Sequence, residues 1–325
     1  MPSPLSDPPG ATRSGTQSAP SWKRKGVGRR ADSLFAVLAG LCGGLVLLVL
    51  GYMVVSTTGT ALPVFRSEGI SFITGSEWNP GDGEFGILAF IYGTVVTSVI
   101  ALIIAVPLSL GVSLFLTEYA PKRIRGPVMY AVDLLAAVPS VIYGLWGVFI
   151  LLPLFLQPAA EFFAKYLGFI PIFAGPPSGL SYFGAGIILA IMITPIISSL
   201  SREVFATVPS ADRYAAYALG ATKWEMIRQA VLPRSRAGIV GAVMLGLGRA
   251  LGETIAIALL IGSRAEIDAS ILRLGYSMAA VIANQFQDAT DEHIRALVGI
   301  GVVLFGMTIV INMAARALVL RFSRA

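Results

Sequence analysis

The chain has 325 residues, of which 55% are hydrophobic and only 13% are charged, and its formal net charge is +6. Soluble domains carry about 25% charged residues, so this chain has too little polar surface to keep a compact globule in water. A single cysteine, Cys42, and a single histidine, His293, exclude an internal disulfide and a metal site built from these two residue types. We therefore expect an all-α integral membrane protein.

The N-terminal segment 1–32 is rich in proline, serine and glycine and then becomes basic, without any hydrophobic period. This composition predicts a disordered tail. The apolar run that follows, at about 34–57, is longer than the 7–15 residues or so of a signal-peptide core. We interpret it as a helix that stays in the membrane.

Apolar runs long enough to cross a bilayer recur through the rest of the chain. A spanning helix needs about 20 apolar residues. We predict one membrane domain over 33–325 with six spans, at about 34–57, 86–116, 128–156, 182–201, 237–262 and 296–318. Pro139 and Pro153 in the third span predict a kink or an early end.

Lysine and arginine concentrate in alternate connections between these spans. They gather in the N-terminal tail, between the second and third spans, in the connection 202–236 and after the last span, whereas the other connections hold few. Cytoplasmic flanks of membrane helices carry such an excess, so both termini are predicted to be cytoplasmic. Because the positive charge is sorted in this way, it does not indicate a nucleic-acid partner.

The fourth connection, 202–236, is too polar to span a membrane, and its regular residue pattern indicates helices rather than an irregular loop. Ser210 suits the cap of a helix that starts at the next residue, and Gly220 suits the left-handed residue that ends it. Thr222 and Glu225 form a capping box for a second short helix, which Pro233 ends. Such a helical hairpin either docks in a groove of a soluble partner or lies as an amphipathic connection on the lipid surface.

One segment of this connection resembles the EAA motif of ABC importer permeases. The matching residues run from Ala215 to Ala221 (Ala-Ala-Tyr-Ala-Leu-Gly-Ala), with Leu232-Pro233 at the expected distance. In that family this loop is a coupling helix that seats in the nucleotide-binding subunit. The resemblance therefore assigns ATPase coupling to Ala215, Ala216, Gly220, Ala221, Leu232 and Pro233. Tyr214 stands at the position of the motif's glutamate, so the carboxylate for a salt bridge to the ATPase is missing there.

Four further segments resemble the permease subunit of phosphate-specific importers, the PstC type. They are Trp78-Asn79-Pro80 followed by Phe85-Gly86, Tyr92-Gly93-Thr94, the run from Val138 to Gly147, and the run from Gly248 to Thr254. The resemblance extends over most of the chain after the tail. It implies a bacterial plasma-membrane subunit that forms half of a phosphate translocation pathway and works by alternating access.

The same resemblance implies the partners. They are a homologous second permease, two copies of an ABC ATPase, an extracytoplasmic phosphate-binding protein and the lipid membrane. No Gly-x-x-x-x-Gly-Lys-Ser/Thr phosphate loop suited to ATP occurs in this chain. We therefore expect no enzyme activity and no cofactor here, with ATP and magnesium bound by the separate ATPase.

Two opposite charges, Arg249 and Glu253, lie in the middle of the fifth span. A lone charge there is costly, and residues four apart on a helix share a face and can pair. One interpretation is a structural ion pair. The other is an anion station, in which the planar arginine fork binds phosphate oxygens and the glutamate offsets its charge between transport events. Asp133 is a weaker pathway candidate, with an interfacial carboxylate near Arg123 and Arg125 as the simpler interpretation.

Other functions fit parts of this pattern. A secondary transporter driven by an ion gradient needs no ATPase, but such proteins show internal repeats, and none is evident here. A permease of the same superfamily for sulfate or molybdate is another alternative, and only the PstC-like segments argue against it. A membrane-bound enzyme is disfavoured, because the sequence offers no cluster of metal ligands, no nucleophile–base set and no cofactor fingerprint.

Overall fold

The computed structural model describes residues 27–323, with the side chains of residues 32–317. Most of the predicted disordered tail lies outside the described residues. Helix α1 (Val27–Ser67) nevertheless begins inside the segment predicted to be disordered, because extending a helix that has already formed costs little. The chain divides into a unit of residues 1–53 and a unit of residues 54–325.

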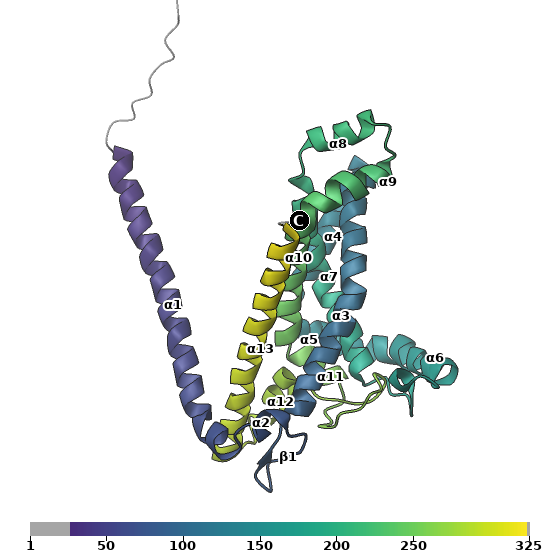
Figure 1. Cartoon of the computed structure of the whole chain (residues 1–325). Helices are drawn as coiled ribbons and strands as arrows, with labels where there is room; N and C mark the ends of the chain where they lie inside the picture. Colours follow the sequence, from purple (N-terminus) through teal and green to yellow (C-terminus); the bar gives the residue numbers. More distant parts are fainter. Residues whose placement is uncertain (1–26, 324–325) are drawn as a thin grey trace, which may run out of the picture. The chain divides into compact units, whose positions relative to one another are not determined.

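Within residues 27–323, six helical stretches are long and apolar enough to cross a membrane. They are Asp32–Ser67, Leu88–Tyr119, Ser140–Leu167, Tyr182–Ala206, Lys223–Gly252 and Asp291–Ala317. The predicted all-α membrane architecture with six spans is therefore confirmed. In Figure 1 the corresponding helices are α3 (Leu88–Leu114), α7 (Tyr182–Ala206), α10 (Leu232–Gly252) and α13 (Asp291–Ser323), together with α1 and the broken third span.

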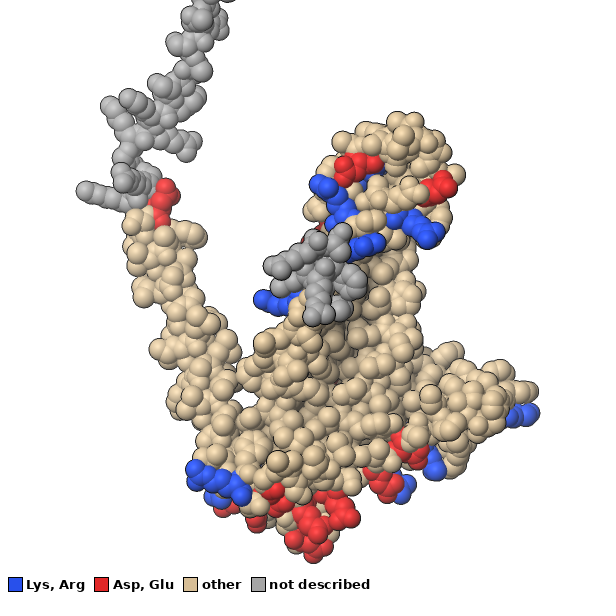
Figure 2. All heavy atoms as spheres, viewed as in Figure 1, with Lys and Arg blue, Asp and Glu red and all other residues tan. Residues whose placement is uncertain are grey.

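The charged residues of the second unit gather at its two ends, and the balance of the two signs differs between these ends. On the face shown in Figure 2, lysine and arginine gather over the end that carries α8 (Ser210–Ala218) and α9 (Lys223–Met226). Most of the visible aspartate and glutamate lies at the opposite end, near β1, and an uncharged band separates the two. This band is the surface that a hydrocarbon layer tolerates.

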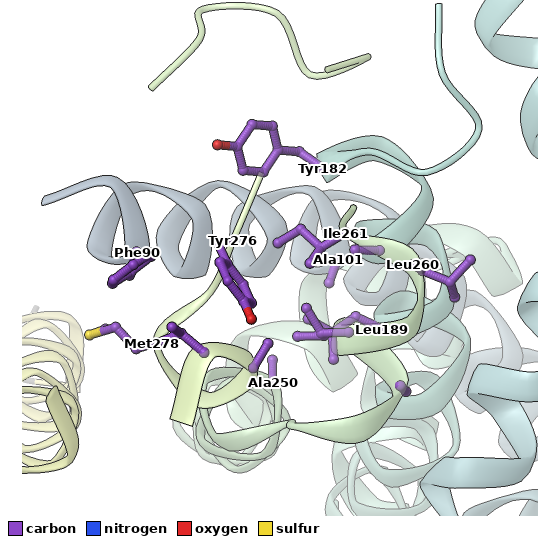
Figure 3. Close-up of a cluster of buried hydrophobic side chains, with 14 of the residues drawn as sticks. Phe90, Ala101, Tyr182, Leu189, Ala250, Leu260, Ile261, Tyr276 and Met278 are labelled. Carbon is purple, nitrogen blue, oxygen red and sulfur yellow. The ribbon is translucent and has the colours of Figure 1, made fainter. Parts of the chain in front are cut away.

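Helix α7 is the centre of the second unit and packs against α3, α10, α4 (Lys122–Ala137) and α11 (Ile255–Leu260). Its apolar residues Leu189, Ile193 and Ile197 are completely buried. Figure 3 shows Leu189 in one cluster with Ala101 of α3 and Ala250 of α10. Small residues at these contacts allow membrane helices to approach closely.

The segment between α11 and α12 (Met278–Gln285) is irregular and is tied to the ends of α3 and α7. The Tyr182 hydroxyl donates to the Glu266 carbonyl at 3.0 Å, and the Tyr92 hydroxyl donates to the Asp268 carbonyl at 2.8 Å. The Met278 N–H donates to the Thr94 hydroxyl at 2.9 Å. These bonds give hydrogen-bond partners to backbone groups of the irregular segment and of the first residue of α12.

Gly93 in α3 is a position where this segment approaches a helix closely, because a Cβ atom there would overlap the Tyr276 carbonyl. We expect Gly93→Ala to destabilise the fold by about 1–3 kcal/mol, the usual cost of overpacking. Gly111 of the same helix has nothing within 4 Å of a Cβ, so Gly111→Ala is expected to be neutral or stabilising. Thermal unfolding of the detergent-purified chain measures both, and equal effects would contradict this account of Gly93.

A short antiparallel hairpin of β1 (Trp78–Asn79) and β2 (Glu84–Phe85) closes the same end of the unit, with Trp78 paired to Phe85. The Trp78 indole N–H donates to the Gln285 side-chain oxygen at 3.0 Å, and its ring packs edge-on against Phe90. The PstC-like Trp-Asn-Pro segment is thereby anchored to α3 and α12. The shortest remaining elements are α2 (Ser71–Thr74) and η3 (Pro171–Phe173).

The third span differs from its predicted position at about 128–156. Helix α4 ends at Ala137, Val138 is extended, and the membrane-crossing stretch runs from α5 (Ser140–Trp146) through a π-helical segment into α6 (Gln157–Leu167). Pro139 causes the break, since it lacks an N–H and disfavours the helical conformation of the residue before it. The second predicted kink, at Pro153, is absorbed in the π-helical segment Gly147–Leu156.

The fifth span also differs from its predicted bounds of 237–262. Its helix already runs from Lys223 to Gly252, and Glu253 is extended, so α11 is a separate short helix that packs against α5. The Thr254 hydroxyl donates to the Gly252 carbonyl at 3.2 Å and satisfies one of the groups freed by this break.

Candidate functional site

The connection between α7 and α10 contains a helix, a bend and a second helical segment, α8, Gly220 and α9. Gly220 has a positive φ of 81°, the left-handed conformation predicted for it. The capping box is also present: the Thr222 side chain accepts from the Glu225 N–H, and the Glu225 carboxylate accepts from the Thr222 N–H. The predicted cap at Ser210 is wrong, because this residue is already helical and Pro209 occupies the cap position without a side-chain bond.

Pro233 was predicted to end the second helix, but the helix continues past it. The second helix is therefore not separate from α10. A π-helical segment (Ile227–Val231) joins α9 to α10, and Pro233 lies in the first turn of α10. The missing N–H of proline costs least in a first turn, and the wider π turn accommodates its ring. The connection is therefore continuous with a helix that is long and apolar enough to cross a membrane.

The root of the connection is held by apolar packing and by hydrogen bonds of one arginine. Phe205, Met226, Ile227 and Val231 form a second apolar cluster of buried residues at this end of the molecule. Arg213 of α8 crosses the same region: it donates to the Val208 and Phe205 carbonyls at 2.6 and 2.8 Å and to Glu118 at 3.0 Å. Glu118 lies at the end of the helix that continues α3, so the pair joins the connection to a second spanning helix.

We expect Glu118→Gln to destabilise the root of the connection by about 3 kcal/mol, because it leaves the Arg213 charge without its counter-ion in a largely buried position. The matched control is Asp212→Asn, which breaks the exposed Arg234–Asp212 pair and is expected to cost less than about 1 kcal/mol. Amide hydrogen exchange of α8 measures both. Equal protection of α8 in the two variants would contradict this role for Glu118.

The tip of the connection exposes large apolar side chains. Leu219 is 89% exposed, Tyr214 is 70% exposed and Trp224 is 58% exposed. The small motif residues Ala215 and Gly220 are also exposed, whereas Ala216 packs on the second apolar cluster. Ala221, Leu232 and Pro233 are half-buried. An exposed apolar surface of this kind usually marks a protein or membrane contact.

A hollow of about 1220 Å³ lies between α10 and α13, with Ile196 of α7 at one wall. Arg249 lines it, and two polar residues of α13, Asn312 and Arg316, line it as well. The other lining residues are apolar or glycine, so no carboxylate lies among them. The arrangement is a cation-lined hollow with low-dielectric walls, which focuses an attractive field for anions.

Glu253 is not the ion-pair partner of Arg249 in this structure. The helix ends at Gly252, so the expected spacing on one helical face is lost. Glu253 is buried to 8% exposure, whereas Arg249 is exposed to the hollow, and the salt bridges of the described residues do not include this pair.

Asp133 is paired with a residue other than its neighbours in sequence. Its carboxylate accepts from Arg202 of α7 at 3.3 and 3.4 Å, and not from Arg123 or Arg125. The Arg202 side chain is 10% exposed and that of Asp133 is 47% exposed. The pair ties α4 to α7, and Asp133 does not line the hollow that contains Arg249.

Asn312 and Arg316 were not predicted as site residues from the sequence, because both lie near the basic end of the last predicted span, 296–318. The available signal was their spacing of four residues, which places both on one face of α13. Nothing local in the sequence indicates that this face lines the same hollow as Arg249. That arrangement depends on the packing of α10 against α13.

Six membrane-crossing helices, a cation-lined hollow and an exposed helical connection define a multi-pass membrane permease. The family model for the binding-protein-dependent transport system inner membrane component matches residues 105–325. The phosphate transport system permease protein PstC of Xylella fastidiosa (strain 9a5c) is 44% identical over 299 residues, which are 91% of this chain and 92% of that protein. The chain therefore belongs to this family of transport permeases and, within it, to the PstC proteins.

Two more PstC relatives are similar over comparable lengths. That of Mesorhizobium japonicum is 43% identical over 296 residues, and that of Haemophilus influenzae is 40% identical over 297 residues. The match to the Mesorhizobium protein covers 89% of this chain and 90% of that protein. The match to the Haemophilus protein covers 90% of this chain and 94% of that protein. These relatives are transport permeases rather than enzymes.

The fold is shared with solved ABC transporters. The match to a bacterial transporter involved in the import of the polysaccharide alginate has a TM-score of 0.58 at 17% identity. It covers 90% of this chain and 96% of the alginate transporter chain. The match to the MetNI methionine transporter in an inward-facing conformation has a TM-score of 0.54 at 16% identity. It covers 73% of this chain and 97% of the MetNI chain. At this identity the likeness concerns the fold alone.

Proposed function

We propose that this chain is the membrane-spanning subunit of an ATP-driven importer of inorganic phosphate and forms half of its pathway by alternating access. The observation that carries the proposal is the similarity over nine-tenths of the chain to permeases of phosphate transport systems. The cation-lined hollow is consistent with it, because a phosphate ion needs positive charge along its route and apolar walls that do not hold it tightly.

Arg249 is the anion station of this proposal. Arg249 is exposed to the hollow, and no carboxylate among the described residues forms a salt bridge with it. Its planar guanidinium group is therefore available to bind phosphate oxygens. Glu253 comes directly after α10, but it is buried and does not line the hollow. The predicted hydrogen bond from a protonated phosphate oxygen to Glu253, which fully ionised sulfate does not offer, therefore has no support in this geometry.

The exposed tip of the connection is the contact to the motor. Leu219, Tyr214 and Trp224 fit a groove on an ABC ATPase, two copies of which would bind ATP and magnesium. Because α9 continues into α10, closure of the motor would tilt the helix that carries Arg249. The apolar contact replaces the salt bridge that a glutamate at position 214 would have made.

The proposed orientation puts α8 and α9 in the cytoplasm and makes both termini cytoplasmic in a bacterial plasma membrane. The charge separation of Figure 2 supports it, because basic residues favour the cytoplasmic side. The opposite end, with β1 and the irregular segment, would meet an extracytoplasmic phosphate-binding protein. Helix α4 has no buried residue and exposes Tyr130 and Leu134, and it is available to a homologous second permease.

Competition between oxyanions tests the substrate. The chain is reconstituted into proteoliposomes with the candidate partner subunits and binding protein, and ATP-dependent uptake of labelled phosphate is measured with a large excess of sulfate or molybdate. We expect neither ion to reduce the uptake. Suppression of phosphate uptake by sulfate or molybdate, together with ATP-dependent uptake of that ion, would assign the chain to another oxyanion.

A further inference from the structure

The hollow between α10 and α13 extends well beyond Arg249. On α10 it follows the helix from Ala237 to Arg249, about 18 Å at a rise of 1.5 Å per residue. Helices α10 and α13 pack together and run in opposite directions (Figure 1). Arg249 is near the C-terminus of α10 and Arg316 near the C-terminus of α13, so the two arginines lie towards opposite ends of one hollow.

Arg316 is accompanied by a second polar residue. Asn312 lies four residues before it, hence on the same face of α13 and about 5–6 Å away between Cβ atoms. The Arg316 guanidinium donates hydrogen bonds only, whereas the Asn312 amide both donates and accepts. Together they match a partly protonated phosphate, with charged oxygens for the arginine and an O–H group for the amide oxygen.

The surroundings leave Arg316 without a competing anion. The side chain is exposed, and the salt bridges of the described residues do not involve it. The residues that separate it from Arg249 in the hollow are apolar, among them Val240, Met244 and Met313. Walls of this kind offer an anion no intermediate hydrogen bonds, so attraction is concentrated at the two ends.

We infer that Arg316 and Asn312 form a second anion station, which receives phosphate after it leaves Arg249 and before it enters the cytoplasm. The inference rests on the proposed function. Two moderately attractive stations joined by an apolar passage allow an anion to move on without being held in one deep site. The shared chemistry of the site is a phosphate group, and a lipid headgroup is the other source of it at this end of α13.

The first test is uptake by the complete complex carrying Arg316→Gln. We expect uptake at limiting phosphate to fall by about tenfold, the effect of losing one charge-assisted hydrogen bond, while assembly and ATP hydrolysis persist. Arg236→Gln is the matched control, because Arg236 is exposed at the same end of α10 but does not line the hollow. It is expected to transport like the unmodified complex.

Vesicle composition distinguishes the two sources of phosphate. The fall caused by Arg316→Gln is expected to be the same in purely zwitterionic vesicles and in vesicles that contain an anionic phospholipid. A fall that appears only with the anionic phospholipid would overturn the inference and assign Arg316 to a lipid headgroup.

A binding readout that does not depend on turnover uses Met313→Cys in a Cys42→Ala background, since Cys42 is the chain's own cysteine. Inorganic phosphate is expected to slow modification of this new thiol by an anionic reagent, and Arg316→Gln is expected to abolish the protection. Normal transport and unchanged protection in Arg316→Gln would overturn the inference alone. Absence of phosphate uptake by the unmodified complex would instead overturn the proposed function, and this inference with it.

Discussion

Replacing Arg249 by glutamine is expected to reduce phosphate uptake by the reconstituted complex about a hundredfold at limiting phosphate. The guanidinium fork gives phosphate two charge-assisted hydrogen bonds of at least about 1.5 kcal/mol each, and their loss amounts to two factors of ten. Because Arg249 is exposed to the hollow and has no salt bridge among the described residues, its removal leaves no buried charge unpaired. The measurement is initial uptake of labelled phosphate.

Two variants separate the anion station from a structural role of Arg249. Arg249→Lys keeps the charge but loses the fork and is expected to recover part of the uptake. Arg236→Gln removes an exposed arginine from the same helix outside the hollow and is expected to have no effect. If Arg249→Gln transported normally in an assembled complex, the hollow would not be the phosphate route.

Leu219→Glu is expected to abolish assembly with the ATPase and, with it, ATP-dependent uptake. Leu219 is 89% exposed at the tip of the connection, so the fold of this chain does not depend on it. Docking in a partner's groove would bury the new carboxylate without a counter-ion, which costs several kcal/mol. Co-purification of the ATPase with the tagged chain measures the effect directly.

The matched control for this variant is Gln229→Glu. It adds the same charge at an exposed residue of the same connection, on the segment that joins α9 to α10. We expect the ATPase to co-purify normally with it. Normal co-purification with Leu219→Glu as well would show that the exposed tip is not the motor contact.

Features with a local cause were predictable from the sequence. The six spans follow from hydropathy, because lipid tolerates only apolar helices of sufficient length. The left-handed Gly220 and the capping box of Thr222 and Glu225 depend on residues within one or two turns of each other. Pro139 was expected to disturb its span, and it ends α4 outright.

Features that depend on tertiary packing were not predictable. Arg249 and Glu253 have the spacing of a helical ion pair, but the helix ends between them and α11 turns to pack against α5. The pair of Asp133 with Arg202 joins residues far apart in the sequence. Pro233 is accommodated by a π-helical segment that no residue pattern predicts. Arg316 reaches the hollow only through the packing of two helices.

The central claim is that this chain moves phosphate as part of an ATP-driven complex, and the source of energy tests it most directly. Proteoliposomes with all candidate subunits and the binding protein are compared with proteoliposomes that lack either this chain or the ATPase, with ATP or with an imposed proton or sodium gradient. We predict phosphate uptake only when this chain, the ATPase and ATP are all present. Phosphate uptake by this chain alone on an ion gradient would contradict the account.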